Sequence, residues 1–282
     1  MSSEHHRHEH DCGLGHDLRV LMGRRRLLGM FAGASLVTLA GCATGTSGGE
    51  PPSGGAPRGG GTPSAGPPNA AASGSANEIP QETAGPFPGD GSNGPNVLTE
   101  SGIVRSDIRS SFGGLSGTAT GVPLTIELTV TDSGNGGVAF PGAAVYVWHC
   151  DRDASYSLYD IEDQNYLRGV QVADTAGKVR FTSIFPAAYS GRWPHIHFEV
   201  YPNLAATTSS DSAITTSQLA LPEATCTEVY TTDGYRASVR NMARTPLDSD
   251  SVFRDGYSTQ LATVTGSVSD GLAAALTVPV EV

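Results

Sequence analysis

Residues 189–200 read YSGRWPHIHFEV. His195 and His197 alternate here with apolar residues, which predicts a β-strand in which both histidines project from the same face. Two imidazoles on one face can bind one metal ion. Tyr189 and Arg192 lie just upstream and would add an anionic oxygen ligand and a fixed cation. We interpret this stretch as an oxidising iron site.

The chain around this stretch is patterned for β-structure. Alternating apolar residues predict strands at 123–131, 143–150, 178–184 and 194–201, and more weakly at 261–265, with Gly, Pro, Asp and Ser clusters between them. Short helices are predicted at 222–230 and 234–242. The pattern indicates a mainly β protein, with a β-sandwich core, long loops and a few short helices, in one domain over residues 78–282.

The strand at 143–150 leads into a second candidate ligand. Its alternation places Tyr146, Trp148 and Cys150 on one face, and His149 on the other face with two valines. A turn-forming run follows and carries Tyr156 just past the end of the strand. Binding residues commonly lie in such loops, although a tyrosine near a strand is more often a packing residue.

The N-terminal segment is typical of an export signal. Arg24, Arg25 and Arg26 precede the apolar stretch 27–41, which is shorter than the roughly 20 residues that span a bilayer. Residues 1–41 are therefore predicted to be a signal peptide, of the twin-arginine type or, as the alternative, of the Sec type. The sequence LAGC at 39–42 resembles a bacterial lipobox, so Cys42 is predicted to be acylated and to anchor the protein outside the cytoplasm.

Residues 42–77 are almost entirely Gly, Ser, Pro, Ala and Thr, which predicts a flexible tether between the anchor and the domain. The chain has 17 basic and 28 acidic residues and a net charge of −11, with Lys178 as its single lysine. This balance excludes nucleic-acid binding through a basic patch.

The cysteines lead to a further prediction. Cys12 would leave with the signal peptide and Cys42 would carry lipid, so Cys150 and Cys226 remain. In an oxidising exterior, two remaining cysteines usually form a disulfide. We therefore predict a bond between Cys150 and Cys226; the alternative is two buried thiols.

Several motifs together resemble the intradiol ring-cleavage dioxygenases, the family of catechol 1,2-dioxygenase and protocatechuate 3,4-dioxygenase, and in particular a secreted, lipoprotein-like branch. The resemblance covers most of residues 80–235. It is carried by TAGPF at 83–87, VWHCD at 147–151, YS at 156–157, IFP at 184–186, the pattern Y-x-G-R-x-x-H-x-H at 189–197, and SQL at 217–219. The family's usual glycine two residues before the first tyrosine is Ala154 in this chain.

The resemblance implies a β-sandwich enzyme with a non-haem Fe(III) ion, whose four ligands by position are Tyr156, Tyr189, His195 and His197. Arg192 and Gln218 occupy the positions of polar residues behind these ligands. The family cleaves catechol-type aromatic diols between their hydroxylated carbons, using both atoms of O2, and gives a muconate-type diacid. By analogy, Tyr189 would leave the metal and accept a substrate proton, and Arg192 would stabilise negative charge on the ring.

Phenolate is a hard, strongly donating ligand, so two phenolates with two imidazoles favour Fe(III) over Fe(II). Tyrosine titrates near 10 in model peptides, and a bound cation is needed to ionise it at neutral pH.

Other interpretations of these residues stay open at this point. His195, His197 and Glu199 alternate on one strand face and could form a two-histidine, one-carboxylate metal site. The domain could also be an inactive, lipid-anchored binding module on the same sandwich.

Single residues have simpler roles as well. The two histidines could be packed side chains, and Gln218 could simply begin a strand. Arg192 could form a surface salt bridge with Asp151 or Glu199.

Overall fold

The computed structural model describes residues 78–282. The predicted signal peptide, the acylated Cys42 and the tether lie outside these residues. In the described part of the chain, no helix has both the length and the apolar character needed to cross a membrane.

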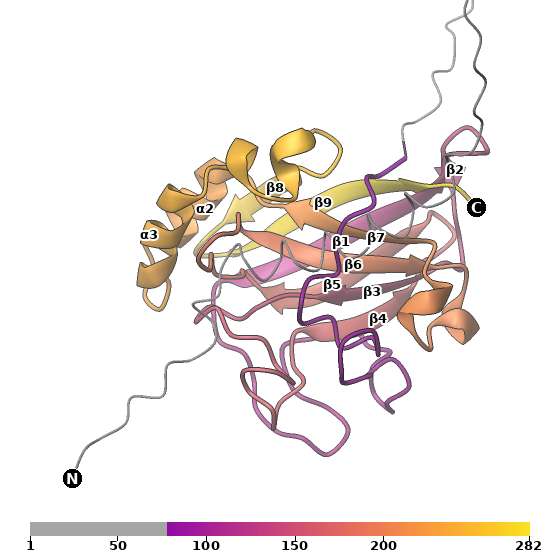
Figure 1. Cartoon of the computed structure of the whole chain (residues 1–282), viewed down its shortest axis with the longest axis horizontal. Helices are drawn as coiled ribbons and strands as arrows, with labels where there is room; N and C mark the ends of the chain where they lie inside the picture. Colours follow the sequence, from indigo (N-terminus) through magenta and orange to yellow (C-terminus); the bar gives the residue numbers. More distant parts are fainter. Residues whose placement is uncertain (1–77) are drawn as a thin grey trace, which may run out of the picture.

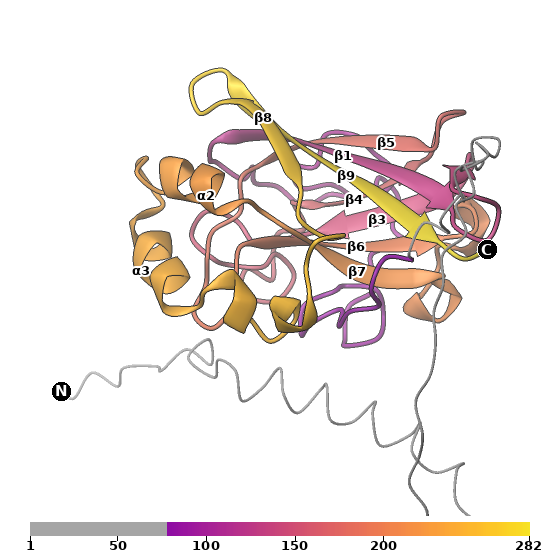
Figure 2. The same ribbon diagram turned by 90° about the horizontal axis from the view of Figure 1, so that it is seen from above.

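Two β-sheets face each other and form a sandwich (Figures 1 and 2). The first sheet has the order β2 (Val138–Ala139), β1 (Pro123–Asp132), β9 (Gly271–Val280) and β8 (Thr263–Ser267), with β5 (Lys178–Ile184) also paired to β1. In this sheet β1 and β9 run parallel. The second sheet is antiparallel and has the order β4 (Arg168–Val172), β3 (Ala144–Trp148), β6 (His195–Tyr201) and β7 (Thr215–Ala220).

Helices are short and lie in the connections. Among residues 78–282 the α-helices are α2 (Glu223–Val229) and α3 (Arg236–Arg244), which lie together at one end of the sandwich (Figures 1 and 2). The same residues also contain the 3-10 turns η2 (Leu204–Ala206), η3 (Ser210–Ser212), η4 (Leu247–Ser249) and η5 (Phe253–Asp255). The predicted fold class, a mainly β sandwich with long loops and few short helices, is confirmed.

The main core lies between the sheets because each strand there turns one set of alternate side chains inward. On β1 the buried residues are every second one, and Ile126 and Leu128 pack against Val145 and Val147 of β3 in one apolar cluster. This confirms the predicted face of β3. The strands β3 and β6 are buried along their whole length, so their other faces must be covered as well.

A second cluster covers the outer face of the β4–β3–β6–β7 sheet. Tyr146, Trp148 and Cys150 belong to it, together with Ala84 from the segment that follows residue 78. That segment starts beside β9, passes the edge of β7 and crosses the outer face of this sheet (Figures 1 and 2). The side chains on the outer face are therefore enclosed, and the candidate ligands lie among them.

The predicted disulfide is contradicted, because Cys150 and Cys226 are both free and buried. They belong to different apolar clusters, Cys150 on the outer face of the sheet and Cys226 on α2 in the main core. The Cys150 thiol donates instead to the carbonyl of Ala187 at 3.6 Å. Burial raises the pKa of each thiol, so both are expected to be unreactive.

Candidate metal centre

The four residues that the sequence marked as ligands come together in one place. The Nε2 atoms of His195 and His197 lie 3.0 Å apart, and the Tyr189 hydroxyl lies 3.2 Å from Nε2 of His195. The rings of Tyr156 and Tyr189 meet edge to face with their centroids 6.1 Å apart, and the rings of Tyr156 and His197 do so at 6.4 Å. Two phenol oxygens and two imidazole nitrogens therefore converge on one point, where a metal ion could lie between them.

Strand β6 places both histidines on the outer face of its sheet. Nδ1 of His195 is hydrogen-bonded to the carbonyl of Trp193, and a carbonyl can only accept, so this nitrogen carries the proton. Nε2 of His195 then keeps its lone pair for a metal ion. His197 is held differently, because its ring stacks on Trp148 at 4.9 Å with an interplanar angle of 7°.

Gly85, in the TAGPF segment, lies against the other ligand ring. Its φ is +72°, a left-handed conformation that favours glycine, and a Cβ at this position would lie 3.3 Å from Cε1 of His197. A side chain at this residue would have to adopt a strained backbone conformation and press against the ring of His197. Gly85 and Trp148 were part of the motifs, but their contacts with His197 could not be inferred from the sequence.

Tyr156 lies in a strained turn after β3. Ala154, where the family pattern has glycine, has a φ of 69°, a conformation that costs an L-residue roughly 1–2 kcal/mol. The turn is held by carboxylates: Asp151 accepts the backbone N–H of Ser155 at 2.9 Å, and Asp160 accepts that of Tyr156 at 2.7 Å. Such strain is found where the surrounding structure fixes a functional side chain.

Buried Arg168 ties this turn to the TAGPF segment. Its guanidinium donates to the carbonyl of Phe87 and to that of Ser157, both at 2.9 Å. The two segments that close over the site are therefore connected through one side chain.

Burial and charge set the protonation states in the metal-free protein. Burial, with Arg192 as the next cause, lowers the pKa of His195 to about 3. Burial and His195 hold the pKa of His197 well below its usual value. Both imidazoles are therefore neutral at pH 7, as metal ligands must be.

The phenol of Tyr156 behaves in the opposite way. Its burial, followed by the neighbouring Tyr189, holds its pKa well above 10. A cation at the site would be needed to convert it to phenolate. A neutral imidazole pair beside two phenols fits a trivalent hard ion such as Fe(III).

Arg192 and Gln218 lie directly behind the ligands. The Arg192 side chain is buried and forms a salt bridge with Asp250, with 3.0 Å between Nε and Oδ2. Its Nη2 donates to Oε1 of Gln218 at 2.7 Å, and Nε2 of Gln218 donates to the carbonyl of Thr83 at 2.8 Å. The surface salt bridge with Asp151 or Glu199 that we considered is wrong, and no sequence motif pointed to Asp250.

The two-histidine, one-carboxylate alternative is also not formed. Glu199 accepts the hydroxyl of Tyr201 at 2.7 Å and that of Thr216 at 3.3 Å. Within residues 78–282, no group of three His, Cys, Asp or Glu side chains is placed to hold a metal ion. The candidate centre therefore depends on its two tyrosines.

His149 lies outside the centre and joins the two sheets. Its Nε2 is 2.7 Å from the hydroxyl of Ser183 on β5, and its Nδ1 is 2.7 Å from the carbonyl of Cys150. Burial lowers its pKa to about 4, so it is neutral in the folded protein at pH 7.

This shift predicts acid sensitivity. Between about pH 6.5 and 4 the unfolded chain binds a proton at His149 that the folded protein does not, so the free energy of unfolding falls as the pH falls. A shift of this size is worth about 3 kcal/mol at pH 4. We expect urea unfolding of the metal-free protein at pH 7, 5.5 and 4.5 to show a smaller pH-dependent loss for His149→Gln than for the wild type. If the free energy of unfolding fell by the same amount with pH in His149→Gln and in the wild type, this assignment would be contradicted.

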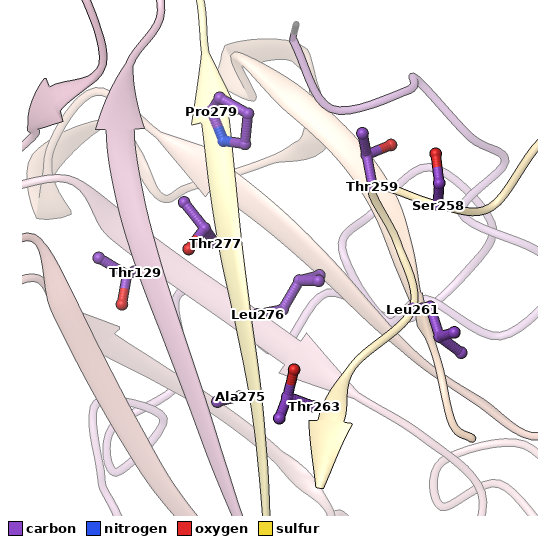
Figure 3. Close-up of a pocket in the computed structure, with 9 residues that line it drawn as sticks. All are labelled: Thr129, Ser258, Thr259, Leu261, Thr263, Ala275, Leu276, Thr277 and Pro279. Carbon is purple, nitrogen blue, oxygen red and sulfur yellow. The ribbon is translucent and has the colours of Figure 1, made fainter. Parts of the chain in front are cut away.

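A surface groove lies elsewhere on the molecule, on the β1–β9–β8 sheet (Figure 3). It is lined by the residues Thr129, Ser258, Thr259, Leu261, Thr263, Ala275, Leu276, Thr277 and Pro279. None of the four candidate ligands lines this groove, so the groove is distinct from the candidate centre.

Comparisons with known proteins point to the same class. No protein-family model matches the chain. A catechol 1,2-dioxygenase from Pseudomonas sp. (strain EST1001) is 39% identical over 54 residues, which cover 19% of this chain and 18% of that protein. An intradiol ring-cleavage dioxygenase from Tetranychus urticae aligns over 73% of this chain and 95% of its own, with a TM-score of 0.57 and 23% identity.

A second dioxygenase structure aligns over 73% of this chain and 94% of its own, with a TM-score of 0.57 and 22% identity. The described residues thus have the fold of the intradiol ring-cleavage dioxygenases, and the resemblance that the motifs predicted is confirmed at this level. The curated match covers less than a fifth of the relative's length.

Proposed function

We propose that the protein is a non-haem Fe(III)-dependent intradiol dioxygenase, which cleaves a catechol-type diol between its hydroxylated carbons with O2 and gives a muconate-type diacid. The observation that carries this proposal is the convergence of Tyr156, Tyr189, His195 and His197 on one buried point. Phenolates together with imidazoles are an uncommon donor set that suits Fe(III). The similarity of the fold to that of intradiol ring-cleavage dioxygenases supports ring cleavage as the class of reaction.

Tyr156, Tyr189, His195 and His197 would hold the Fe(III) ion, which would supply the chemistry that makes the ring of a bound diol reactive toward O2. The residues of the chain prepare this reaction. His195 is fixed by Trp193, and His197 is held between Trp148 and Gly85. Rigid ligands keep the geometry of the site constant and reduce the reorganisation that the reaction requires.

Two side chains would act on the substrate itself. The phenolate form of Tyr189, whose oxygen lies beside Nε2 of His195, would accept a proton from the bound diol. The guanidinium of Arg192 lowers the pKa of both histidines, so its positive charge is felt at the ligands. It would stabilise negative charge that develops on the ring.

Iron-loaded protein tests the proposal. We expect about one Fe(III) per chain and a broad visible absorption from tyrosinate-to-iron charge transfer, which Tyr156→Phe should weaken or shift. A panel of catechol, hydroxyquinol and protocatechuate under 18O2 should give, for at least one diol, a diacid that contains both oxygen atoms. Iron binding without O2 uptake for any diphenol would favour the binding module. Full activity with Zn in colourless protein would contradict the ferric site.

We also propose that the mature protein is a membrane-anchored lipoprotein outside the cytoplasm, attached through Cys42. The LAGC sequence at 39–42 supports this, and two or more acyl chains hold a protein firmly in a bilayer. Unchanged membrane association of Cys42→Ser on cell fractionation would contradict it.

A further inference from the structure

A single carboxylate, Asp250, accepts an unusual number of hydrogen bonds behind the candidate centre. Its Oδ2 accepts Nε of Arg192 at 3.0 Å and the backbone N–H of Trp193 at 2.7 Å. Its Oδ1 accepts Nη2 of Arg192 at 3.3 Å, and the backbone N–H groups of Val252 and Phe253 at 2.8 and 3.3 Å. The Asp250 side chain is 0% exposed and that of Arg192 only 2% exposed.

This ion pair is buried, so the loss of one partner would cost more free energy than it would in a surface ion pair. A guanidinium without its carboxylate would be an uncompensated buried charge, which is strongly unfavourable. Asp250 forms a salt bridge with Arg192, and Glu82 also interacts with the charge of Arg192. Gln218 provides the second contact, and its own amide is held by Thr83.

The two partners hold the same edge of the guanidinium. Asp250 binds Nε and Nη2, and Gln218 binds Nη2. Since the guanidinium is planar, contacts with Nε and Nη2 fix the plane of the group. A carboxylate that also accepts three backbone N–H groups cannot itself move, so it holds this plane in one orientation.

We propose that Asp250 is a positioning residue that holds the guanidinium of Arg192 in place against the reacting ring. This inference rests on the proposed function, because the charge of Arg192 acts on the substrate only if the protein cleaves diols. Asp250 lies 58 residues from Arg192 in the sequence, on the segment between η4 and η5. The hydrogen bonds of its carboxylate described above go to Arg192 and to backbone N–H groups, and none of them goes to a candidate ligand.

The first test uses metal-free, full-length protein and does not depend on activity. Asp250→Asn leaves Arg192 charged and buried, so its melting temperature should fall well below that of the wild type. The double variant Arg192→Gln/Asp250→Asn removes both charges of this pair. It should therefore melt at a higher temperature than Asp250→Asn alone. If Asp250 only capped backbone N–H groups, the double variant would melt at a lower temperature, and the proposal would be overturned.

The second test measures catalysis at matched iron content. We expect Asp250→Asn to lower kcat by 10-fold or more, with KM changed less than about 3-fold and the visible band of the iron unchanged. In an Arg192→Gln background the same substitution should cost little further activity, because the group that it positions is already gone. Losses that multiply independently in the double variant would overturn the proposal.

Asp248 provides a matched control, because it is an exposed aspartate in η4 on the same segment. Asp248→Asn should leave the melting temperature, kcat and KM unchanged. The outcomes separate the two proposals: a wild-type protein that binds no iron or cleaves no diol contradicts the proposed function, whereas the melting temperatures still decide whether Asp250 and Arg192 act as a pair. If Asp250→Asn cannot be purified folded, recovery of folded protein by adding Arg192→Gln supports the pair, and failure of both variants overturns it.

Discussion

Replacement of His197 by alanine is expected to reduce the iron content of the purified protein to background. Its Nε2 lies 3.0 Å from that of His195, so the two imidazoles form one half of the candidate ligand set. Substitutions behind a metal ligand already cost roughly 10- to 100-fold in metal affinity, and loss of a ligand should cost more. His195→Ala should have the same effect. Iron analysis and the visible spectrum provide the measurements.

His149→Gln is the control for these variants. His149 is also buried, but it bonds Ser183 and Cys150 and lies outside the centre. Its replacement should leave iron binding intact. Each variant needs a circular dichroism spectrum, since His197 also stacks on Trp148 and its loss leaves a cavity. A folded His197→Ala protein with a full complement of Fe(III) would show that the centre has been placed wrongly.

Tyr189→Phe is expected to separate metal binding from catalysis. The variant should keep some iron through Tyr156, His195 and His197, because these three donors remain. It should lose most turnover, since the phenolate oxygen that would accept the substrate proton is gone, and such bases contribute roughly 10²- to 10⁴-fold. Single-turnover cleavage of the best diphenol at matched iron content is the measurement.

Tyr159→Phe provides a comparison for that loss. The Tyr159 hydroxyl donates to the carbonyl of Asn93 at 3.2 Å and accepts the N–H of Gly89 at 2.9 Å, so it belongs to the segment that covers the site rather than to the centre. The turnover of the Tyr159→Phe variant should stay close to that of the wild type. A near-normal rate for Tyr189→Phe would mean that another group accepts the proton.

Of the strands that the sequence predicted, β1 and β5 alternate between more and less buried residues, whereas β3 and β6 are buried along their whole length. The alternation on β1 and β5 has a period of two, and the predicted and observed bounds of β5 are identical. Strands β4, β7 and β9 were missed for physical reasons. Strand β7 reads TTSQLA and is polar at its start, β4 begins with the buried Arg168, and β9 is rich in alanine with a glycine and a proline.

The sequence by itself determined which residues can form the candidate centre. Strand periodicity placed His195 and His197 on one face, and the resemblance to the dioxygenase family implied Tyr156 and Tyr189 as the other two ligands. The structure brings all four together. The placement of the two histidines on one face depends on local geometry, in which the position of a residue in a strand fixes the direction of its side chain.

Only the tertiary structure decided the partners of these residues. Arg192 binds Asp250, Gly85 lies against His197, and the thiols of Cys150 and Cys226 are buried in separate clusters instead of being bonded. Each of these depends on segments far apart in the sequence, whose approach is set by the packing of two sheets and the loops that cover them. Local periodicity carries no information about which distant segment will cover a given face. The guanidinium of Arg192 therefore acquires its partners and its orientation only in the folded chain.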